Sequence, residues 1–422
     1  MGKILVVHCS VGRSPEACIE TIVENLKEHG NDVTIFTEFY DRNKHCPPVE
    51  YKNGIKIFRT YNWEREIFAC LERIKNSRGN HNRFFLNFWL GCVWWMLKIV
   101  FAGTIRIFPF LKAELLAYKM EKKYEEEPFD LIFATTAPFF AVQAASIFCK
   151  AHPEVKMVVY MFDPYINNIM YANSSRAIKK RICAAECFFP AASAVIATPE
   201  VYKAEAASFK FPCPVEKIAL PLLHEIKKVC TEAPLLANDT GRLKLFFCGA
   251  LHSFRNPEFI FRLLLHEELQ HIEVHIAGNG DLSSIEKYRA ILGDRLIYHG
   301  LVEPEKCYEA MFDADILLHL GNKTNTQIPG KLFEYMATGK PIIHLYYIDD
   351  DGCLPYLKKY PLQLSIRENT SEDKCVSEWL AFWGRSEKRV LAFDEIETEC
   401  SDFLAKNVLE RVRQTVDRVL KQ

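Results

Sequence analysis

Short apolar runs alternate with amphipathic segments through the first half of the chain. The runs Lys3 to His8, Val33 to Phe36 and Leu131 to Thr135 predict strands, and Pro15 to Gly30 predicts a helix. A further run, Val155 to Phe162, predicts another strand. Strands that alternate with helices are typical of a parallel sheet, so this half predicts a Rossmann-like α/β domain.

The second half repeats this alternation after a linker near Leu220-Pro221-Leu222-Leu223. Its predicted strands are Lys244 to Cys248, Glu273 to Ala277, Leu296 to His299 and Asp315 to His319. An amphipathic helix pattern from Asp402 to Leu420 closes the chain. We therefore expect one domain over residues 1–220, a second over 221–400 and a C-terminal helix over 401–422.

The stretch from Gly321 to Ile343 carries more specific information. A polar loop leads into Pro329-Gly330, a short helix pattern follows, and Gly339 is a natural helix stop. Lys331 falls in the first turn, where the helix dipole disfavours a cation by about 0.3–1 kcal/mol unless an anion shares the site. Glu334 lies on the same face and can accept hydrogen bonds from a ribose diol. The pair predicts a nucleotide site, and the alternative is a solvated Lys–Glu ion pair.

The same stretch resembles the nucleotide-binding signature of the retaining GT-B glycosyltransferases of group 1, family 4, roughly P-x-K-x-x-E-Y-M-A-x-G-K-P-I. The matching residues are Pro329, Lys331, Glu334, Tyr335, Met336, Ala337, Gly339, Lys340, Pro341 and Ile342. The resemblance implies an α/β GT-B fold, in which two Rossmann-like domains face a central cleft and a C-terminal helix packs back on the first. It also implies retaining transfer from a nucleotide diphosphate sugar, without a metal or a further cofactor.

The resemblance assigns roles to particular residues. Lys331 and Arg255 would stabilise the leaving diphosphate, and Glu334 would hold the ribose. Asp163, at the end of a strand in the first domain, would face the cleft, or it would only start the turn before Pro164. The donor-binding residues that we expect beside these are Gly12, Gly249, Gly278, Gly280, Thr326, Gln327 and Gly330.

Two positions depart from the family pattern. Thr326 stands where the family usually has a second glutamate, and Ala250 stands where it usually has an arginine. Arg255 replaces the usual lysine before an asparagine, and arginine also binds phosphate. The departures motivate one alternative function, a non-catalytic nucleotide-sugar-binding membrane scaffold. A GT-B nucleotide-sugar epimerase is a second alternative.

A basic aromatic segment interrupts the first domain at residues 73–113. It contains seven basic residues, no acidic residue and nine aromatic residues. Its apolar part is long enough to span a bilayer. However, strands of one sheet are predicted before and after it, and a single crossing would place the two halves of this sheet on opposite sides of the membrane. Lys98 would add a cost of about 3 kcal/mol to a crossing. We therefore expect peripheral membrane contact through 84–112; a buried helical excursion or a dimer face is the alternative.

Composition and cysteine usage bear on the partners, the cellular compartment and the metal content to be expected. A net charge of −1 gives no reason to expect nucleic acid as a general partner. The 15 cysteines include no C-x-x-C pair, and the start of the chain lacks a secretory signal. We expect a cytoplasmic protein, peripheral on the inner membrane face. No metal site is expected, because His252, His299 and His319 lack metal-ligand spacing and Asp349-Asp350-Asp351 predicts a solvated turn.

These observations together predict a hexosyltransferase-like enzyme that uses a nucleotide diphosphate sugar. Because the basic aromatic segment lies in the first domain, we expect a lipid-linked or polysaccharide acceptor and a role in cell-surface glycan synthesis.

Overall fold

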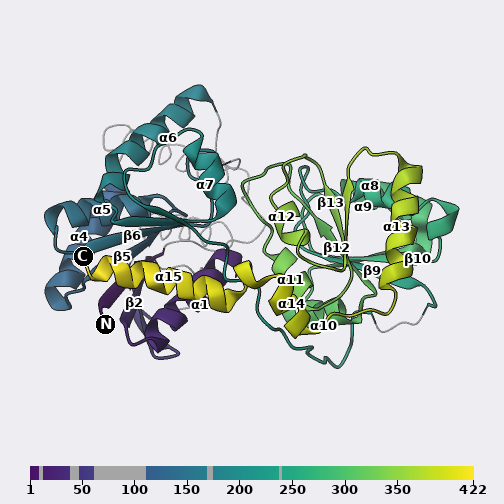
Figure 1. Ribbon diagram of the computed structural model, residues 1–422, viewed down its shortest axis with the longest axis horizontal. Helices are drawn as coiled ribbons and strands as arrows, with labels where there is room; N and C mark the ends of the chain where they lie inside the picture. The colour runs from purple at the N-terminus through teal and green to yellow at the C-terminus, as the bar shows by residue number, and fades with distance from the viewer. Residues whose placement is uncertain (9–12, 39–46, 61–110, 169–173, 237–239) are drawn as a thin grey trace, which may run out of the picture. The chain divides into compact units, whose positions relative to one another are not determined.

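The computed structural model describes residues 1–8, 13–38, 47–60, 111–168, 174–236 and 240–422. The chain forms two compact units (Figure 1). Unit 1 comprises Met1–Thr198, Glu205–Ile218 and Arg411–Gln422, and unit 2 comprises Pro199–Ala204 and Ala219–Glu410. Each unit has a sheet of its own.

Unit 1 is built on an eight-stranded sheet with the order β3-β4-β2-β1-β5-β6-β7-β8 among the described residues. Its strands are β1 (Lys3–Val7), β2 (Asp32–Glu38), β3 (Val49–Lys52), β4 (Ile55–Thr60), β5 (Leu131–Thr135), β6 (Lys156–Met161), β7 (Ala194–Ala197) and β8 (Val215–Lys217). All neighbouring strands are parallel except β3 and β4. The central strands β1, β5 and β6 are apolar and almost fully buried, as parallel strands covered on both faces are.

Helices cover this sheet on its two faces (Figure 1). They are α1 (Arg13–Glu28), α4 (Leu111–Glu126), α5 (Phe140–Ala151), α6 (Ser175–Phe188) and α15 (Ala405–Leu420), with α7 (Pro199–Ala206) shared between the units. Seven of the twelve residues of α5 are buried, and most of them are small, so this helix packs closely on the sheet. The Ser174 hydroxyl caps α6 by accepting a hydrogen bond from the Ala177 N–H at 3.2 Å.

Unit 2 is built on a six-stranded parallel sheet with the order β11-β10-β9-β12-β13-β14. Its strands are β9 (Leu243–Cys248), β10 (Ile272–Ala277), β11 (Leu296–Gly300), β12 (Ile316–Leu320), β13 (Ile342–Tyr346) and β14 (Gln363–Arg367). Its helices are α8 (Glu258–Leu263), α9 (Ser283–Leu292), α10 (Pro304–Asp313), α11 (Lys331–Ala337), α12 (Leu354–Leu357), α13 (Glu372–Ser386) and α14 (Phe393–Glu399). The core lies between the sheet and helices such as α8 and α13, with Phe261 and Trp379 fully buried.

The strand order of unit 2 reverses between β9 and β12. Successive strands β10 and β11 add on one side of β9, and β12 to β14 add on the other. Ligands of open α/β sheets bind at the carboxyl ends of the strands beside such a reversal. We therefore expect a ligand site at the loops after β9 and β12, which comprise residues 249–256 and 321–330.

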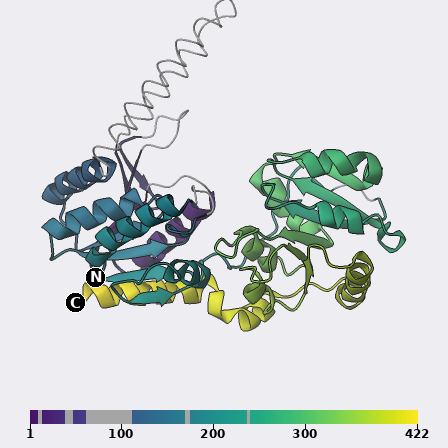
Figure 2. The same cartoon turned by 90° about the horizontal axis from the view of Figure 1, so that it is seen from above.

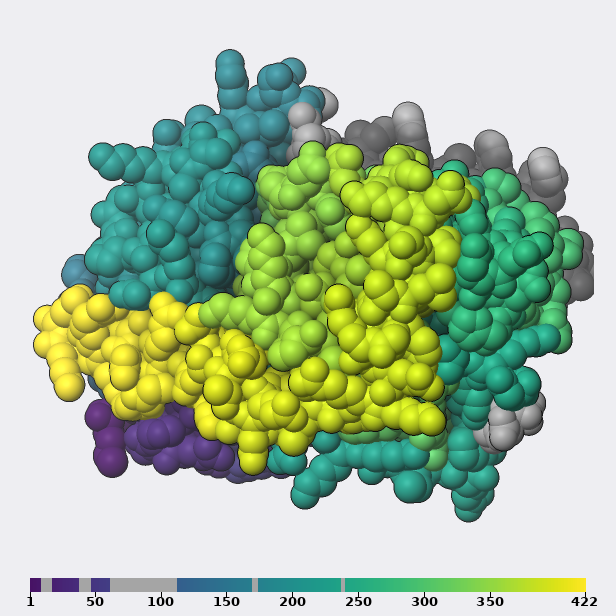
Figure 3. Space-filling model, turned by 45° about the vertical axis from the view of Figure 1, so that its right-hand side comes forward, coloured from purple at the N-terminus to yellow at the C-terminus, as the bar shows by residue number. Residues whose placement is uncertain are grey.

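The C-terminal residues are part of unit 1 although α15 begins in unit 2. Val412, Val416 and Val419 are buried. Arg411 donates a hydrogen bond to the carbonyl of Lys217 at 2.7 Å, and Arg418 forms an ion pair with Glu216 at 2.6 Å. The last turn also reaches the chain start, because a Cβ on Gly2 would lie 2.9 Å from Leu420. Figure 3 shows the C-terminal residues at the surface beside the N-terminal segment.

Of the basic aromatic segment 73–113, only residues 111–113 lie in the described chain, at the start of α4. Figure 2 gives a second view of the helices and sheets that are described. In the described part of the chain, no helix has both the length and the apolar character that a membrane crossing needs. Peripheral membrane contact through 84–112 stays a prediction.

Candidate functional site

Helix α11 brings Lys331 and Glu334 together at its first turn. Gly330 is the residue before the helix, and the Lys331 ammonium forms an ion pair with the Glu334 carboxylate. The side chains are 31% and 24% exposed, so the pair is half-buried rather than solvated. Burial acts to lower the pKa of Lys331, but the charges of Glu334, Cys248 and Tyr308 and the hydrogen bond to Glu334 together outweigh it, so this pKa lies above its usual value. The ammonium also lies 5.1 Å from the centroid of the Tyr308 ring.

Helix α11 is fixed to the carboxyl end of β9 by Tyr335, the fifth of its seven residues. The buried Tyr335 hydroxyl accepts a hydrogen bond from the Cys248 N–H at 2.8 Å and lies 3.4 Å from the Cys248 carbonyl oxygen. Contact with the Cys307 thiol and burial raise the pKa of Cys248, and the charges of Lys331 and Glu334 also act on this thiol. The ion pair therefore lies beside the end of β9, at the strand reversal.

The predicted glycines Gly249, Gly278 and Gly280 come together at the carboxyl edge of the same sheet. The Gly249 N–H donates to the Ala277 carbonyl at 2.9 Å. A Cβ on Gly278, whose φ is +151°, would lie 1.9 Å from the Gly249 carbonyl oxygen. A Cβ on Gly280, whose φ is +116°, would lie 2.0 Å from the Leu251 carbonyl oxygen. The loops after β9 and β10 thus pack backbone against backbone, which only glycine permits.

Arg255 joins the loop after β9 to the loop after β12. Its Nε and Nη2 both donate to Asn322 Oδ1, at 3.0 and 2.5 Å, and Asn322 donates onward to the Gln327 carbonyl at 2.9 Å. Burial lowers the pKa of Arg255 from its usual value. The guanidinium is thus held in a defined position with part of its donor capacity used by Asn322.

Thr326 does not present a free hydroxyl in this loop. Its side chain is buried, and its Oγ1 lies 2.9 Å from Thr324 Oγ1. The position therefore lacks the carboxylate that the resembled family carries there.

The remaining predicted residues lie in unit 1. Asp163 follows β6, is partly buried, and its carbonyl accepts a hydrogen bond from Thr136 Oγ1 at 3.3 Å. Gly12 lies outside the described residues. The structure thus groups Gly249, Gly278, Gly280, Arg255, Thr326, Gln327, Gly330, Lys331 and Glu334 in unit 2, and places Asp163 in unit 1.

His8 is a candidate that sequence reasoning missed. It lies at the carboxyl end of β1 and is 5% exposed, with Nδ1 3.0 Å from Thr135 Oγ1. Its Nε2 is buried and has no hydrogen-bond partner among the described residues, and burial lowers the pKa of the imidazole to about 4. The available signal was a histidine directly after an apolar strand, at the sheet edge where ligands gather.

The expectation of a solvated turn at residues 349–351 is wrong for its last residue. Asp349 and Asp350 are exposed, but Asp351 is 3% exposed. Its Oδ1 accepts a hydrogen bond from the Cys353 N–H at 2.7 Å, at the start of α12. The carboxylate is buried because it turns inward to this backbone group.

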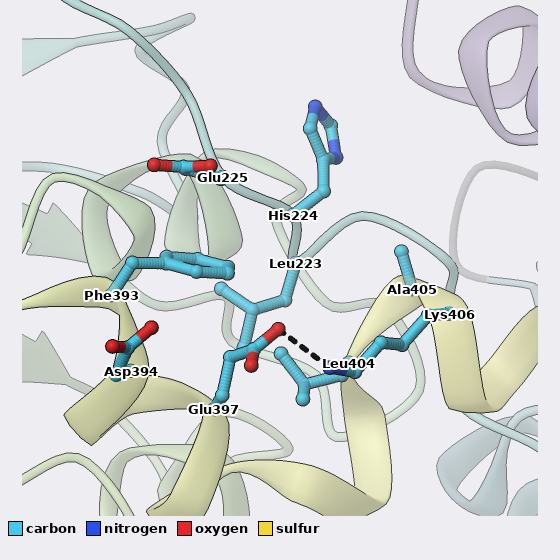
Figure 4. Close-up of a pocket in the computed structure, with 9 residues that line it drawn as sticks. All are labelled: Leu223, His224, Glu225, Phe393, Asp394, Glu397, Leu404, Ala405 and Lys406. Atoms are coloured by element: carbon cyan, nitrogen blue, oxygen red, sulfur yellow. Dashed lines mark hydrogen bonds and ion pairs between the residues drawn. The ribbon is translucent and has the colours of Figure 1, made fainter.

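A pocket of about 280 Å³ lies elsewhere in unit 2 (Figure 4). Its lining includes Leu223, His224, Phe393 and Glu397, and the Glu397 carboxylate accepts a hydrogen bond from the Lys406 ammonium at 2.7 Å. None of the predicted site residues that the structure describes lines it. The predicted donor residues of unit 2 lie instead on the loops after β9, β10 and β12 and at the start of α11.

Two Rossmann-like α/β units and a C-terminal helix define the GT-B fold, as the sequence resemblance predicts. The structure is similar over its whole length to sucrose-phosphate synthase from Thermosynechococcus elongatus, with a TM-score of 0.64, 13% identity and 100% of each chain covered. The HepE protein of Anabaena, solved with UDP and glucose, aligns with a TM-score of 0.62 and 12% identity, covering 99% of this chain and 100% of that one.

A third similar structure is WaaG, a glycosyltransferase involved in lipopolysaccharide biosynthesis, with a TM-score of 0.53 and 12% identity over 98% of this chain and 99% of that one. No protein-family model matches the sequence, and no curated protein matches it by sequence. The similarity therefore rests on the fold, which these glycosyltransferase structures share with this chain.

Proposed function

We propose that this protein is a glycosyltransferase that moves a sugar from a nucleotide diphosphate sugar to an acceptor with retention of configuration. The observation that carries the proposal is the Lys331–Glu334 pair, held by Tyr335 at the end of β9 beside the strand reversal. HepE has been solved with UDP-glucose, which supports a donor of this class for the shared fold.

Donor binding would exchange the partners of this ion pair. The Lys331 ammonium turns to a phosphate, and the Glu334 carboxylate accepts hydrogen bonds from the ribose diol. Before the donor arrives, each charge neutralises the other in a half-buried position, where an isolated charge would be costly. The net gain on binding is then the difference between the two sets of contacts.

Catalysis would be largely electrostatic. Lys331 and Arg255 stabilise the negative charge that develops on the leaving diphosphate, and the glycine loops let backbone approach the donor closely. Asp163 belongs to unit 1, to which we assign the acceptor. No side chain is assigned the role of nucleophile. We assign a lipid-linked or polysaccharide acceptor and a place in cell-surface glycan synthesis, because of the basic aromatic segment at 73–113.

The first test is UDP binding by Glu334→Ala. We expect about a 10- to 100-fold loss of affinity, equivalent to about 1.5–3 kcal/mol for hydrogen bonds to a charged group, measured by calorimetry and thermal shift. Glu378→Ala is the matched control, because Glu378 forms an exposed ion pair with Lys374 at 3.8 Å on α13. Equal UDP affinity in both variants would place the nucleotide elsewhere.

The second test concerns the membrane. Deletion of 84–112 is expected to abolish flotation of the full chain with vesicles that contain anionic lipids, because the basic residues interleaved with aromatics are lost. UDP-induced thermal stabilisation should remain, since the donor residues lie in unit 2. Unchanged flotation would refute membrane contact through this segment without affecting the donor site.

A non-catalytic nucleotide-sugar binder is the second candidate, favoured by Thr326, whose hydroxyl contacts Thr324 where the family carries a glutamate. Measurement of UDP release from UDP-sugars separates the two functions. Binding with no hydrolysis or transfer for any donor and acceptor tested would support the binder.

A further inference from the structure

Three side chains with metal-binding atoms meet inside unit 2, although the spacing of His319 along the sequence predicts no metal site. His319 and His344 are paired in register on the parallel strands β12 and β13, and Cys353 lies directly before α12. They are 2%, 0% and 1% exposed. One ligand atom from each lies within 4.8 Å of the other two.

Hydrogen bonds among the described residues do not satisfy every polar atom of this cluster. His319 Nδ1 lies 2.9 Å from His344 Nδ1, and a neutral imidazole has one N–H, so this contact holds at most one hydrogen bond. Within the part of the chain that the structure describes, the Nε2 atoms of both rings and Asp351 Oδ2 are buried and make no hydrogen bond. A buried polar atom without a hydrogen bond is destabilising, so three of them at one place call for an explanation.

The residues around the two imidazoles suit a metal ligand set. Asp351 Oδ1 lies 3.5 Å from His344 Nε2, on the side of the ring away from His319. This contact is too long and poorly aligned to count as a hydrogen bond, but the charge of the carboxylate favours the tautomer with the proton on Nε2, which leaves Nδ1 to bind a cation. Gly321 makes room for the arrangement, because a Cβ there would lie 2.3 Å from Asp351 Oδ2 and 3.1 Å from His344 Cε1.

Charge balance is also consistent with a divalent ion. On binding, the Cys353 thiol gives its proton to solvent and its sulfur to the ion: R–SH + M²⁺ → R–S–M⁺ + H⁺. The thiolate and the buried Asp351 carboxylate then offset both charges of the ion, so that the Arg255 cation nearby does not face an unbalanced charge.

We propose that His319, His344 and Cys353 bind one divalent transition-metal ion of the zinc class, with Asp351 orienting His344. Two imidazole nitrogens and a thiolate are ligands that zinc prefers, whereas magnesium and calcium take oxygen ligands. Three protein ligands leave a fourth position of a tetrahedral site for water or another group. The site does not depend on the sugar-transfer function proposed above.

Titration of the full chain with Co²⁺, after treatment with a chelator, tests the proposal. We expect one equivalent of Co²⁺ to give the visible bands of a tetrahedral complex and a thiolate charge-transfer band, and one equivalent of Zn²⁺ to remove them. Cys353→Ser should abolish the charge-transfer band. Asp351→Asn should keep that band but weaken Zn²⁺ binding by about 10- to 100-fold.

Matched variants separate this site from other thiols. Cys375→Ser alters another buried cysteine of unit 2 and should leave the spectrum unchanged, and so should replacement of the exposed Cys183 and Cys187. Circular dichroism checks folding, and His344→Gln replaces Cys353→Ser if the latter does not fold. The proposal is overturned if the unaltered chain gives no tetrahedral Co²⁺ spectrum. It is equally overturned if Cys353→Ser and His344→Gln bind Co²⁺ as Cys375→Ser does.

Discussion

At the scale of single residues, the pairing of Lys331 with Glu334 shows why sequence alone left two readings of this helix open. The Lys–Glu ion pair of the alternative interpretation is present, but it lies half-buried beside the end of β9 and is not fully solvated. An exposed Lys–Glu pair on a helix contributes about 0.3–0.5 kcal/mol to stability wherever it lies on the surface, so stability alone does not explain a half-buried position beside β9. Location, which spacing along the chain does not encode, therefore gives the pair its candidate role.

His8 should make the stability of the protein depend on pH. Its pKa is lowered to about 4 in the folded chain against an ordinary value of 6.5, so between these values the unfolded chain binds the extra proton. The free energy of unfolding therefore falls as the pH drops from about 6.5 toward 4. The His8 share of this slope is about 1.4 kcal/mol per pH unit near pH 5.

Urea unfolding of the unaltered chain and of His8→Gln at pH 7 and pH 5 measures this share. The glutamine variant should lose less stability on acidification. His299, whose pKa is also about 4 because of burial, is left intact in both proteins and serves as the common background. An equal loss in the two proteins would show that His8 is not held neutral by the fold.

At the scale of elements, the close backbone packing of the loops after β9 and β10 is open to a direct test. Gly278→Ala places a methyl group 1.9 Å from the Gly249 carbonyl oxygen, so we expect a loss of about 3 kcal/mol or more in the free energy of unfolding. Gly293→Ala is the control, because its φ is +59° but a Cβ there meets nothing within 4 Å.

The control variant should lose only about 1 kcal/mol, from backbone strain alone. If both alanine variants unfold at the same urea concentration, the two loops do not approach as closely as the structure has them.

The apolar runs predicted the central strands well. β1, β5, β9 and β10 begin and end within a residue of the expected positions, because buried parallel strands are continuous apolar segments. The edge strand β14 was not predicted, since its sequence QLSIR is only partly buried and its alternation is weak. Helix α14 was missed because Ile396 is its one buried residue.

The part of the candidate site that could be predicted is the part whose residues are close together in the sequence. Lys331 and Glu334 belong to one motif on one helix, so the sequence places them together. His319, His344 and Cys353 come from three segments, and only the parallel register of β12 and β13 brings the two imidazoles side by side. A search for metal-ligand spacing along the chain therefore passes over them.

At the scale of the whole molecule, the assignment of donor residues to unit 2 predicts which amides a bound nucleotide protects from hydrogen exchange. UDP should slow hydrogen exchange of the amides of α11 and of residues 249–256, because bound ligand suppresses local opening. Amides of β2 and β4 in unit 1 should exchange at unchanged rates. Protection confined to unit 1 would contradict the donor assignment.

The hydrogen bonds of Tyr335 to Cys248 have a consequence for how donor preference could be changed. Because the hydroxyl attaches α11 to a strand of the unit 2 sheet, this sheet fixes the position of the helix that carries Lys331 and Glu334. The segments 250–256 and 321–328, in contrast, are loops whose residues can be exchanged without disturbing that attachment. A change of base or sugar preference should therefore be sought by varying the residues of these loops other than Arg255 and Gly321, while Tyr335 is kept.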